Sequence, residues 1–198
     1  KWRFQAGGNV FSTPAVAEGL VCIGSRDRSI YALDADTGEV RWSFAAGRGL
    51  SASPAIADGV LTIGSEDGHV YALGLRTGHE CWRIAAGYPV VSSAAVDAGV
   101  LYVGMGGARP GVPGGGVLAI DLKTARERWR REISPGAGVS SPAVAGDLLF
   151  CGSRDHSLHA LDAATGAARW SFPTGHEVIG TPAVSGGTVY FTSCDAHV

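Results

Sequence analysis

The sequence predicts an all-β protein, a β-propeller built from four-stranded blades with repeats of about 40 residues. Two independent markers support this prediction. Tryptophans recur at intervals of 40, 40, 47 and 41 residues, at Trp2, Trp42, Trp82, Trp129 and Trp170. The start of each unit recurs at nearly the same intervals, at Pro14, Pro54, Ala94, Pro142 and Pro182. Because both series lengthen around residues 104–116, we expect one loop insertion in an otherwise regular array.

Each unit divides into four short strands separated by turn residues. In the first unit they are STPAVA (12–17), LVCIGS (20–25), SIYALD (29–34) and EVRWSF (39–44), and later units repeat this order. Runs rich in Val, Ile, Tyr and Phe, separated by Gly, Asp and Thr-Gly, are typical of strands and tight turns. Small residues in the first strand and tryptophan in the fourth fit blades that widen outward from a central channel. The tryptophans would then fill the gaps between neighbouring blades.

The predicted organisation is one repeat domain over residues 1–198. Its expected parts are the outer strand of a preceding blade (1–11), blades at 12–52, 53–92, 93–139 and 140–180, and a partial blade at 181–198. The third blade contains the 104–116 insertion. Because the chain begins on a fourth strand and stops early in a third one, we expect an incomplete ring, four full blades plus partial ones, from a longer chain. A dimer that completes the ring is an alternative.

The turn before each tryptophan is predicted to end in a left-handed residue, which glycine adopts without strain. Gly38, Gly78 and Gly166 satisfy this requirement, whereas the equivalent residue of the third unit is Ala125. A left-handed alanine costs roughly 1–2 kcal/mol. We therefore expect the third unit to use a different turn.

Composition excludes several classes of function. Hydrophobic residues make up 45% of the 198 residues and charged residues 17%, so the chain can bury a core. A net charge of −2 provides no basic surface for nucleic acid or an anionic membrane. No apolar run approaches the ~20 residues that span a bilayer, so no membrane insertion of this segment is expected. The cysteines, Cys22, Cys81, Cys151 and Cys194, show no C-x-x-C spacing. We expect four free thiols and no metal, with a disulfide as the alternative.

The phrase ALDADTGEVRW (32–42) returns at 72–82, 119–129 and 160–170. This Ala-x-Asp-x-x-Thr-Gly-x-x-x-Trp pattern resembles the tryptophan-docking motif of the pyrroloquinoline-quinone (PQQ) dehydrogenase-type β-propeller repeat. The resemblance covers essentially the whole chain and implies that each tryptophan docks on the next blade. The second copy departs from the pattern at Gly74 and the third at Ala125.

The family that the motif resembles includes enzymes and binding proteins. Its quinoprotein dehydrogenases bind PQQ and Ca²⁺, whereas an outer-membrane assembly lipoprotein and the sensor domains of some bacterial kinases are non-enzymatic. The adjacent cysteine pair of the dehydrogenases is missing here. We therefore expect a non-catalytic binding or sensing scaffold without a cofactor. A fragment of a PQQ-dependent dehydrogenase, with PQQ and Ca²⁺, is the alternative. The resemblance also implies a bacterial extracytoplasmic or periplasmic location.

Candidate binding residues gather at one edge of the predicted blades. The loops leading into each first strand and the turns joining each second and third strand share this edge. We call it the variable edge, because its residues differ between units while the framework does not. The predicted ligand- or partner-binding residues there are Arg26, Arg48, Tyr88, Arg109, Arg154, His156 and His176, with Phe11 beside them. Ordinary solvated loop residues are the alternative. We expect a protein or small-molecule partner and no nucleic acid.

One aspartate recurs in the same turn of four units, as Asp27, Asp67, Asp155 and Asp195. Such carboxylates accept hydrogen bonds from turn amides, and we expect this role rather than a shared cation site. His156 and His159 are three residues apart, so on a strand their side chains would point to opposite faces. A metal shared by these two histidines is therefore not expected.

Overall fold

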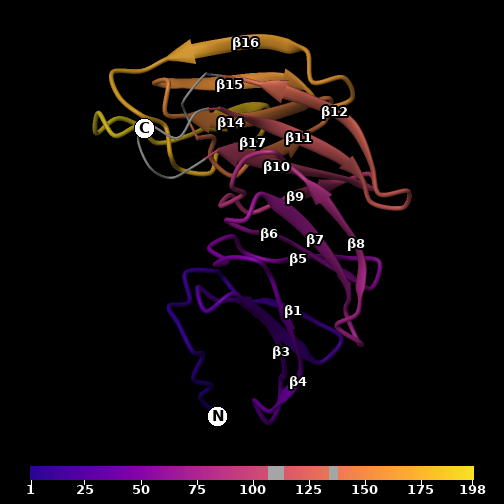
Figure 1. Ribbon diagram of the computed structural model, residues 1–198. Helices are drawn as coiled ribbons and strands as arrows, with labels where there is room; N and C mark the ends of the chain where they lie inside the picture. Colours follow the sequence, from indigo (N-terminus) through magenta and orange to yellow (C-terminus); the bar gives the residue numbers. More distant parts are fainter. Residues whose placement is uncertain (107–113, 134–137) are drawn as a thin grey trace. The chain divides into compact units, whose positions relative to one another are not determined.

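The computed structural model describes residues 1–106, 114–133 and 138–198, and these ranges contain strands and turns but no helix. The strands form four-stranded antiparallel sheets and one two-stranded sheet (Figure 1). Every four-stranded sheet keeps its strands in chain order, which is the meander of a propeller blade. The predicted all-β blade fold is confirmed. No helix of the described residues is long and apolar enough to cross a membrane.

The first compact unit is Lys1–Ala94. One of its sheets contains β1 (Ala15–Ala17), β2 (Leu20–Gly24), β3 (Ser29–Asp34) and β4 (Val40–Ala45). The other contains β5 (Ala55–Ala57), β6 (Val60–Gly64), β7 (His69–Gly74) and β8 (Glu80–Ala85). Each sheet lies within one of the predicted blade ranges, 12–52 and 53–92.

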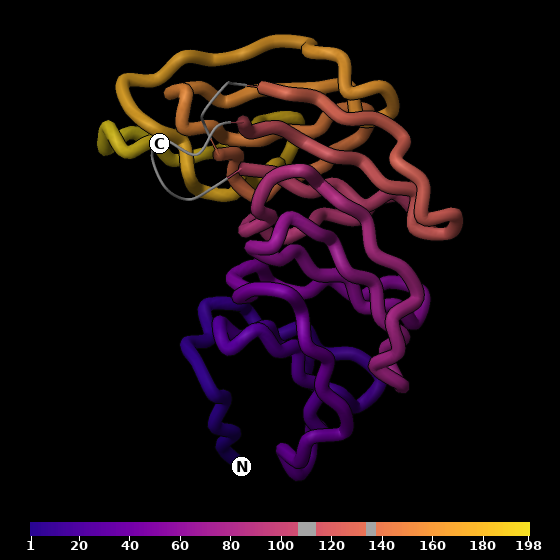
Figure 2. The backbone as a smooth tube through the Cα atoms, viewed as in Figure 1, coloured from indigo at the N-terminus to yellow at the C-terminus, as the bar shows by residue number. Residues whose placement is uncertain are grey.

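The second compact unit is Ala95–Val198 (Figure 2). Its first sheet contains β9 (Ala95–Asp97), β10 (Val100–Gly106), β11 (Gly115–Asp121) and β12 (Arg126–Glu132). Its second contains β13 (Ala143–Ala145), β14 (Leu148–Ser153), β15 (Ser157–Asp162) and β16 (Ala168–Pro173). The strands β17 (Ala183–Ser185) and β18 (Thr188–Tyr190) form the two-stranded sheet. The predicted insertion at 104–116 falls largely on residues 107–113, which lie outside the described residues.

The strand register explains why alanine opens the repeated phrase. Ala32 of β3 lies opposite Trp42 of β4, and Ala160 of β15 lies opposite Trp170 of β16. A bulge follows the alanine in each case and bends the strand. The small side chain leaves the space beside it to the large indole of the neighbouring strand.

The core of each unit lies between its neighbouring sheets. In the first unit, Leu20 and Ile30 belong to the same buried cluster as Leu61 and Leu73 of the next sheet. In the second unit the equivalent cluster joins residues of β10–β12 to residues of β14 and β15. Burying one such Leu or Ile contributes about 1.5–3 kcal/mol, so each sheet depends on its neighbour for stability.

Tryptophans of β12, β4 and the N-terminal segment lie against the Thr-Gly turn of the following sheet. The indole Nε1 of Trp129 donates a hydrogen bond of 3.0 Å to the carbonyl of Ala163. Trp2 and Trp42 donate equivalent bonds to the carbonyls of Ala35 and Leu75, at 2.9 and 2.8 Å. Trp170 is 42% exposed, and its ring centroid lies 5.8 Å from that of Phe150 in its own sheet.

Glycine in this turn meets two requirements at once. Gly166 has a φ of 72°, and a Cβ built on it would lie 2.5 Å from the Trp129 ring. Gly38 and Gly78 face Trp2 and Trp42 in the same way. The turn therefore combines a left-handed backbone with close approach of an indole.

Ala125 corrects one expectation from the sequence. Its φ is 54°, and its amide donates to the carbonyl of Asp121 at 2.9 Å, so the third unit uses the same turn. The expectation of a different turn was wrong because the Asp121 carboxylate holds this one. It accepts hydrogen bonds from the amide and hydroxyl of Thr124 and pairs with Arg128 at 2.6 Å. These bonds offset the roughly 1–2 kcal/mol of backbone strain.

Candidate functional site

The variable edge is assembled by the meander and by one recurring backbone hydrogen bond. In a meander the turn between the second and third strands and the loop into the first strand lie at the same edge. Among the described residues, a turn amide donates to a loop carbonyl in four places, from Arg26 to Asn9, Glu66 to Gly49, Arg154 to Gly138 and Cys194 to Glu177. In each of these blades the backbone bond therefore places the turn residue beside the loop, while the identity of that residue differs from blade to blade.

The recurring aspartates hold these turns. The Asp67 carboxylate accepts hydrogen bonds from the Gly47 amide at 2.8 Å and the His69 amide at 2.9 Å. Burial by itself would raise the pKa of Asp67, but the Tyr71 hydroxyl and these amides hold that pKa below its ordinary value. Asp27 and Asp195 make equivalent bonds, whereas Asp155 contacts the His159 ring at 3.0 Å. The predicted role of the aspartates in capping turn amides is confirmed for Asp27, Asp67 and Asp195.

At the variable edge of the first unit, a cation, a carboxylate and an aromatic ring meet. Arg26 Nη2 lies 3.1 Å from Glu66 Oε1, at the equivalent turn position of the next sheet. The Arg26 guanidinium also lies 5.9 Å from the ring centroid of Phe11, which is 62% exposed. Ser51 donates a hydrogen bond to Glu66 at 2.9 Å. Opposite charges are therefore already paired here, and the exposed Phe11 ring is available for a further contact.

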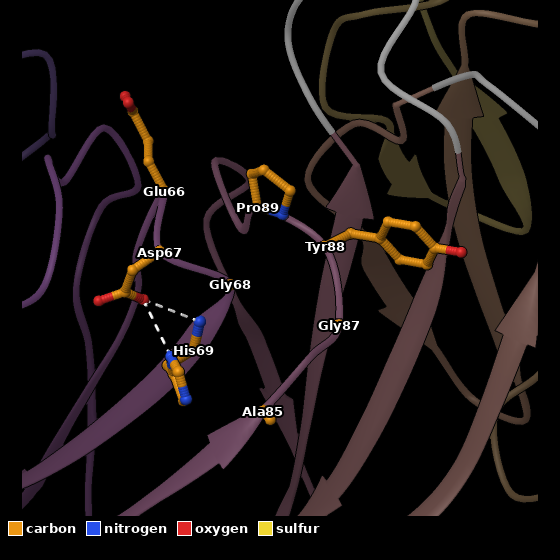
Figure 3. Close-up of a pocket in the computed structure, with 8 residues that line it drawn as sticks. All are labelled: Glu66, Asp67, Gly68, His69, Ala85, Gly87, Tyr88 and Pro89. Atoms are coloured by element: carbon orange, nitrogen blue, oxygen red, sulfur yellow. Dashed lines mark hydrogen bonds and ion pairs between the residues drawn. The ribbon is translucent and has the colours of Figure 1, made fainter.

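A shallow pocket of about 210 Å³ opens beside this group (Figure 3). It is lined by Glu66, Asp67, Gly68, His69, Ala85, Gly87, Tyr88 and Pro89. His69 contacts Asp67 through its amide and its ring Nδ1, whereas the Tyr88 ring points away from them (Figure 3). The volume of this pocket is below the roughly 300–1,000 Å³ of pockets that enclose a small molecule. The geometry suits a surface contact better than an enclosed ligand.

Three of the predicted residues come together in the second unit. The rings of His156 and His176 stack with centroids 5.3 Å apart and planes 10° apart. Arg154 Nη1 donates to Glu177 Oε2 at 2.7 Å. His156 has a φ of 68° and belongs to the turn before β15, so it is directed to His176 while His159 contacts Asp155.

The other predicted residues are spread along the edge. Arg48 is exposed, and its carbonyl accepts a hydrogen bond from the Ser65 hydroxyl at 3.4 Å. Tyr88 is partly buried at the pocket. Arg109 lies outside the described residues, so its predicted place at the variable edge has no structural counterpart here.

Sequence reasoning missed Glu66, Glu177 and Cys194 as residues of this edge. Glu66 and Cys194 occupy the turn position of Arg26 and Arg154 in the repeat, and that alignment was the available signal. Glu177 directly follows the predicted His176. Its contact with Arg154 joins residues 23 positions apart, which the repeat pattern alone does not reveal.

All four cysteines are free, which confirms the expectation of thiols. Cys22 and Cys151 are buried, and burial raises the pKa of both thiols, that of Cys22 to about 11. Buried thiols of this kind are chemically inert. Cys81 and Cys194 are exposed, and of these only Cys194 lies at the variable edge.

The sequence matches the protein family described as outer membrane protein assembly factor BamB over residues 1–140 and 113–198. The chain belongs to this family. A solved structure of a protein described by the same name, BamB from Moraxella catarrhalis, is similar with a TM-score of 0.60 at 20% sequence identity. The match covers 98% of this chain and 70% of that one.

The fold of this chain is also similar to that of solved dehydrogenases. The quinohemoprotein alcohol dehydrogenase ADHIIG from Pseudomonas putida HK5 gives a TM-score of 0.78 at 20% identity, over 96% of this chain and 39% of that one. A 1-butanol dehydrogenase (cytochrome c) from Thauera butanivorans is 39% identical over 71 residues. Those residues are 35% of this chain and 10% of that protein, so the chain spans a small part of its length. The structural likenesses show the β-propeller fold.

Among the described residues, the side chains that gather as possible metal ligands are not the oxygen-only set that the sequence resemblance implied for Ca²⁺. Ca²⁺ takes six to eight oxygen ligands. The group of metal-ligand side chains found among the described residues is His176, Glu177 and Cys194, which offers one imidazole, one carboxylate and one thiol. Asp34, in the repeated motif, is already engaged by Arg41, and that ion pair holds the pKa of the Asp34 carboxyl well below its ordinary value.

Proposed function

We propose that this chain is a non-catalytic scaffold that binds a polypeptide or small ligand through the variable edge of its blades. The observation that supports it best is the recurring amide–carbonyl bond at this edge, which keeps the loop geometry constant while the side chains change. Repeat proteins recognise partners in this way, with a fixed framework and variable surface residues. The match to the assembly-factor family extends over the whole chain and supports the same function.

The chemistry of the edge favours a polypeptide over the small ligand. Two of its cations are paired with carboxylates, as Arg26–Glu66 and Arg154–Glu177, which weakens the attraction of the edge for a polyanion. Phe11 adds an exposed aromatic ring, and aromatic residues are enriched in protein interfaces. A partner with mixed charges and apolar side chains would complement this surface. The description of the family supports an extracytoplasmic location in a bacterium.

The test replaces three variable-edge residues, Arg48, Tyr88 and His176, by alanine. The probe is a set of synthetic peptides from bacterial outer-membrane polypeptides, with binding measured by fluorescence anisotropy. We expect the wild-type chain to bind a subset of the peptides and the triple variant to bind none of them. The melting temperature should stay unchanged, because Arg48 and His176 are exposed and Tyr88 is only partly buried.

A matched control replaces three exposed residues at the opposite edge of the sheets, Asp36, Glu39 and Lys123, by alanine. This control should bind peptides like the wild-type chain. Equal binding by both triple variants would refute a role for the variable edge. Collapse of the fold in the first variant would show that its residues are framework.

The second candidate function is part of a PQQ-dependent dehydrogenase, and the 39% identity to the 1-butanol dehydrogenase over 71 residues favours it. PQQ would supply the two-electron oxidant when bound. The test adds PQQ and Ca²⁺ to the purified chain and measures absorbance of the bound cofactor and dye-linked oxidation of 1-butanol. Either signal would overturn the scaffold proposal.

A further inference from the structure

Three side chains with metal-ligand chemistry meet at the variable edge of the second unit. His176 and Glu177 belong to the loop before β17, and Cys194 belongs to the turn after β18. Their ligand atoms all lie within 4.8 Å of one another. In a tetrahedral zinc site such atoms are about 3.3–3.6 Å apart, as bond lengths of roughly 2.0–2.3 Å require. Small rotations of these solvent-accessible side chains would bring the ligand atoms from their present separation to the distances of a zinc site.

The framework brings the two segments together independently of the three side chains. The Cys194 amide donates to the Glu177 carbonyl at 2.9 Å, which is the bond that recurs in the other blades. The hydroxyls of Thr174 and Ser193 both donate to the His176 carbonyl, at 2.6 and 3.1 Å. The backbone positions of the candidate ligands are thus fixed by bonds that a metal would leave intact.

The surroundings restrain two of the candidate ligands. The His156 ring stacks on His176 and limits its rotation. Arg154 pairs with the Glu177 carboxylate and, as a cation, competes with a metal for it. The Glu177 amide donates to His176 Nδ1 at 2.9 Å, so the neutral ring carries its proton on Nε2. Coordination through either ring nitrogen would therefore break this hydrogen bond.

We propose that His176, Glu177 and Cys194 form a binding site for one divalent transition metal of the zinc class. Imidazole, carboxylate and thiolate together suit a borderline-soft ion such as Zn²⁺ and are a poor set for Ca²⁺ or Mg²⁺. Three protein ligands leave a fourth tetrahedral position to water or to a group of a bound partner. The thiol loses its proton on binding, so affinity falls as the pH is lowered. The site does not depend on the proposed scaffold function.

The experiment titrates the whole chain with Co²⁺, which reports a cobalt–thiolate bond by charge-transfer absorption, and with Zn²⁺ in competition. We expect one Co²⁺ per chain, displaced by Zn²⁺. Cys194→Ser should abolish the charge-transfer band, and His176→Ala and Glu177→Gln should each weaken binding by about tenfold or more. Arg154→Met should tighten binding, because it removes the competing cation.

Cys81→Ser is the matched control, since Cys81 is the other exposed free cysteine and lies in the first unit. This variant should bind Co²⁺ with the wild-type spectrum and affinity. The proposal is overturned if the wild-type chain shows no band, if Cys194→Ser keeps it, or if Cys81→Ser loses it. Thermal unfolding of each variant without metal verifies that a lost band reflects a lost ligand.

Discussion

Substitution of Gly166 by alanine tests whether the indole contact between sheets stabilises this fold. Gly166 has a φ of 72°, and an alanine Cβ would lie 2.5 Å from the Trp129 ring. Trp129 is also fixed by its bond to the Ala163 carbonyl and by the Tyr102 ring, 5.9 Å away between centroids. The indole therefore cannot move aside without losing these contacts.

The expected loss of unfolding free energy in Gly166→Ala is the sum of two contributions. A left-handed alanine costs roughly 1–2 kcal/mol. Overpacking against a held side chain costs typically about 1–3 kcal/mol more. We expect Gly166→Ala to lower the free energy of unfolding by about 2–5 kcal/mol. Gly146→Ala in the same unit isolates the first contribution, because Gly146 has a φ of 61° and nothing lies within 4 Å of its Cβ position.

The assay is urea unfolding followed by tryptophan fluorescence, with midpoints compared at an unchanged slope. The difference between the two variants, about 1–3 kcal/mol, measures the contact with Trp129. If Gly166→Ala proves no more destabilising than Gly146→Ala, the indole does not pack on this turn tightly enough to stabilise the pair of sheets, and the reasoning fails.

Two further predictions concern the same turns. Ala125→Gly should raise the free energy of unfolding by about 0.5–1 kcal/mol, because relief of left-handed strain exceeds the added entropy of the unfolded chain; an unchanged urea midpoint would contradict this. Hydrogen bonds from Thr165 and from Arg169 lower the pKa of Asp162 to about 2. The stability that Asp162 contributes is therefore fully present above its unfolded pKa of about 3.9 and is lost as the pH falls through about 2. In Asp162→Asn, the free energy of unfolding measured by urea titration should fall less between about pH 4 and pH 2 than in the wild-type chain. Parallel plots of unfolding free energy against pH for the two proteins would refute the pairing of Asp162 with Thr165 and Arg169.

Much of the fold was predictable because a propeller repeats its local rules. Each blade needs a small residue opposite its own indole, as with Ala32 and Trp42, and a turn glycine against the preceding indole, as with Gly38 and Trp2. Such requirements recur at a fixed interval, so the period and the strand boundaries can be recognised in the amino-acid sequence alone. The exception was Ala125. Asp121 and Thr124 belong to the repeated motif, but the motif does not show that their hydrogen bonds hold the same turn when alanine replaces glycine.

For the candidate sites, the sequence predicted where binding residues gather but not which side chains contact one another. The variable edge was predictable because the meander fixes which loops share an edge. The pairing of Arg154 with Glu177, the stacking of His156 on His176 and the approach of Cys194 were not, because side chains at variable positions follow no period.

The amino-acid sequence by itself determined the blade architecture, the positions of its strands and the edge at which recognition is expected, since these depend on patterns that every repeat shares. Only the tertiary structure decided which variable side chains meet, because such contacts depend on distances between loops of successive blades. Those distances are set by the packing of whole sheets rather than by any local stretch of the chain.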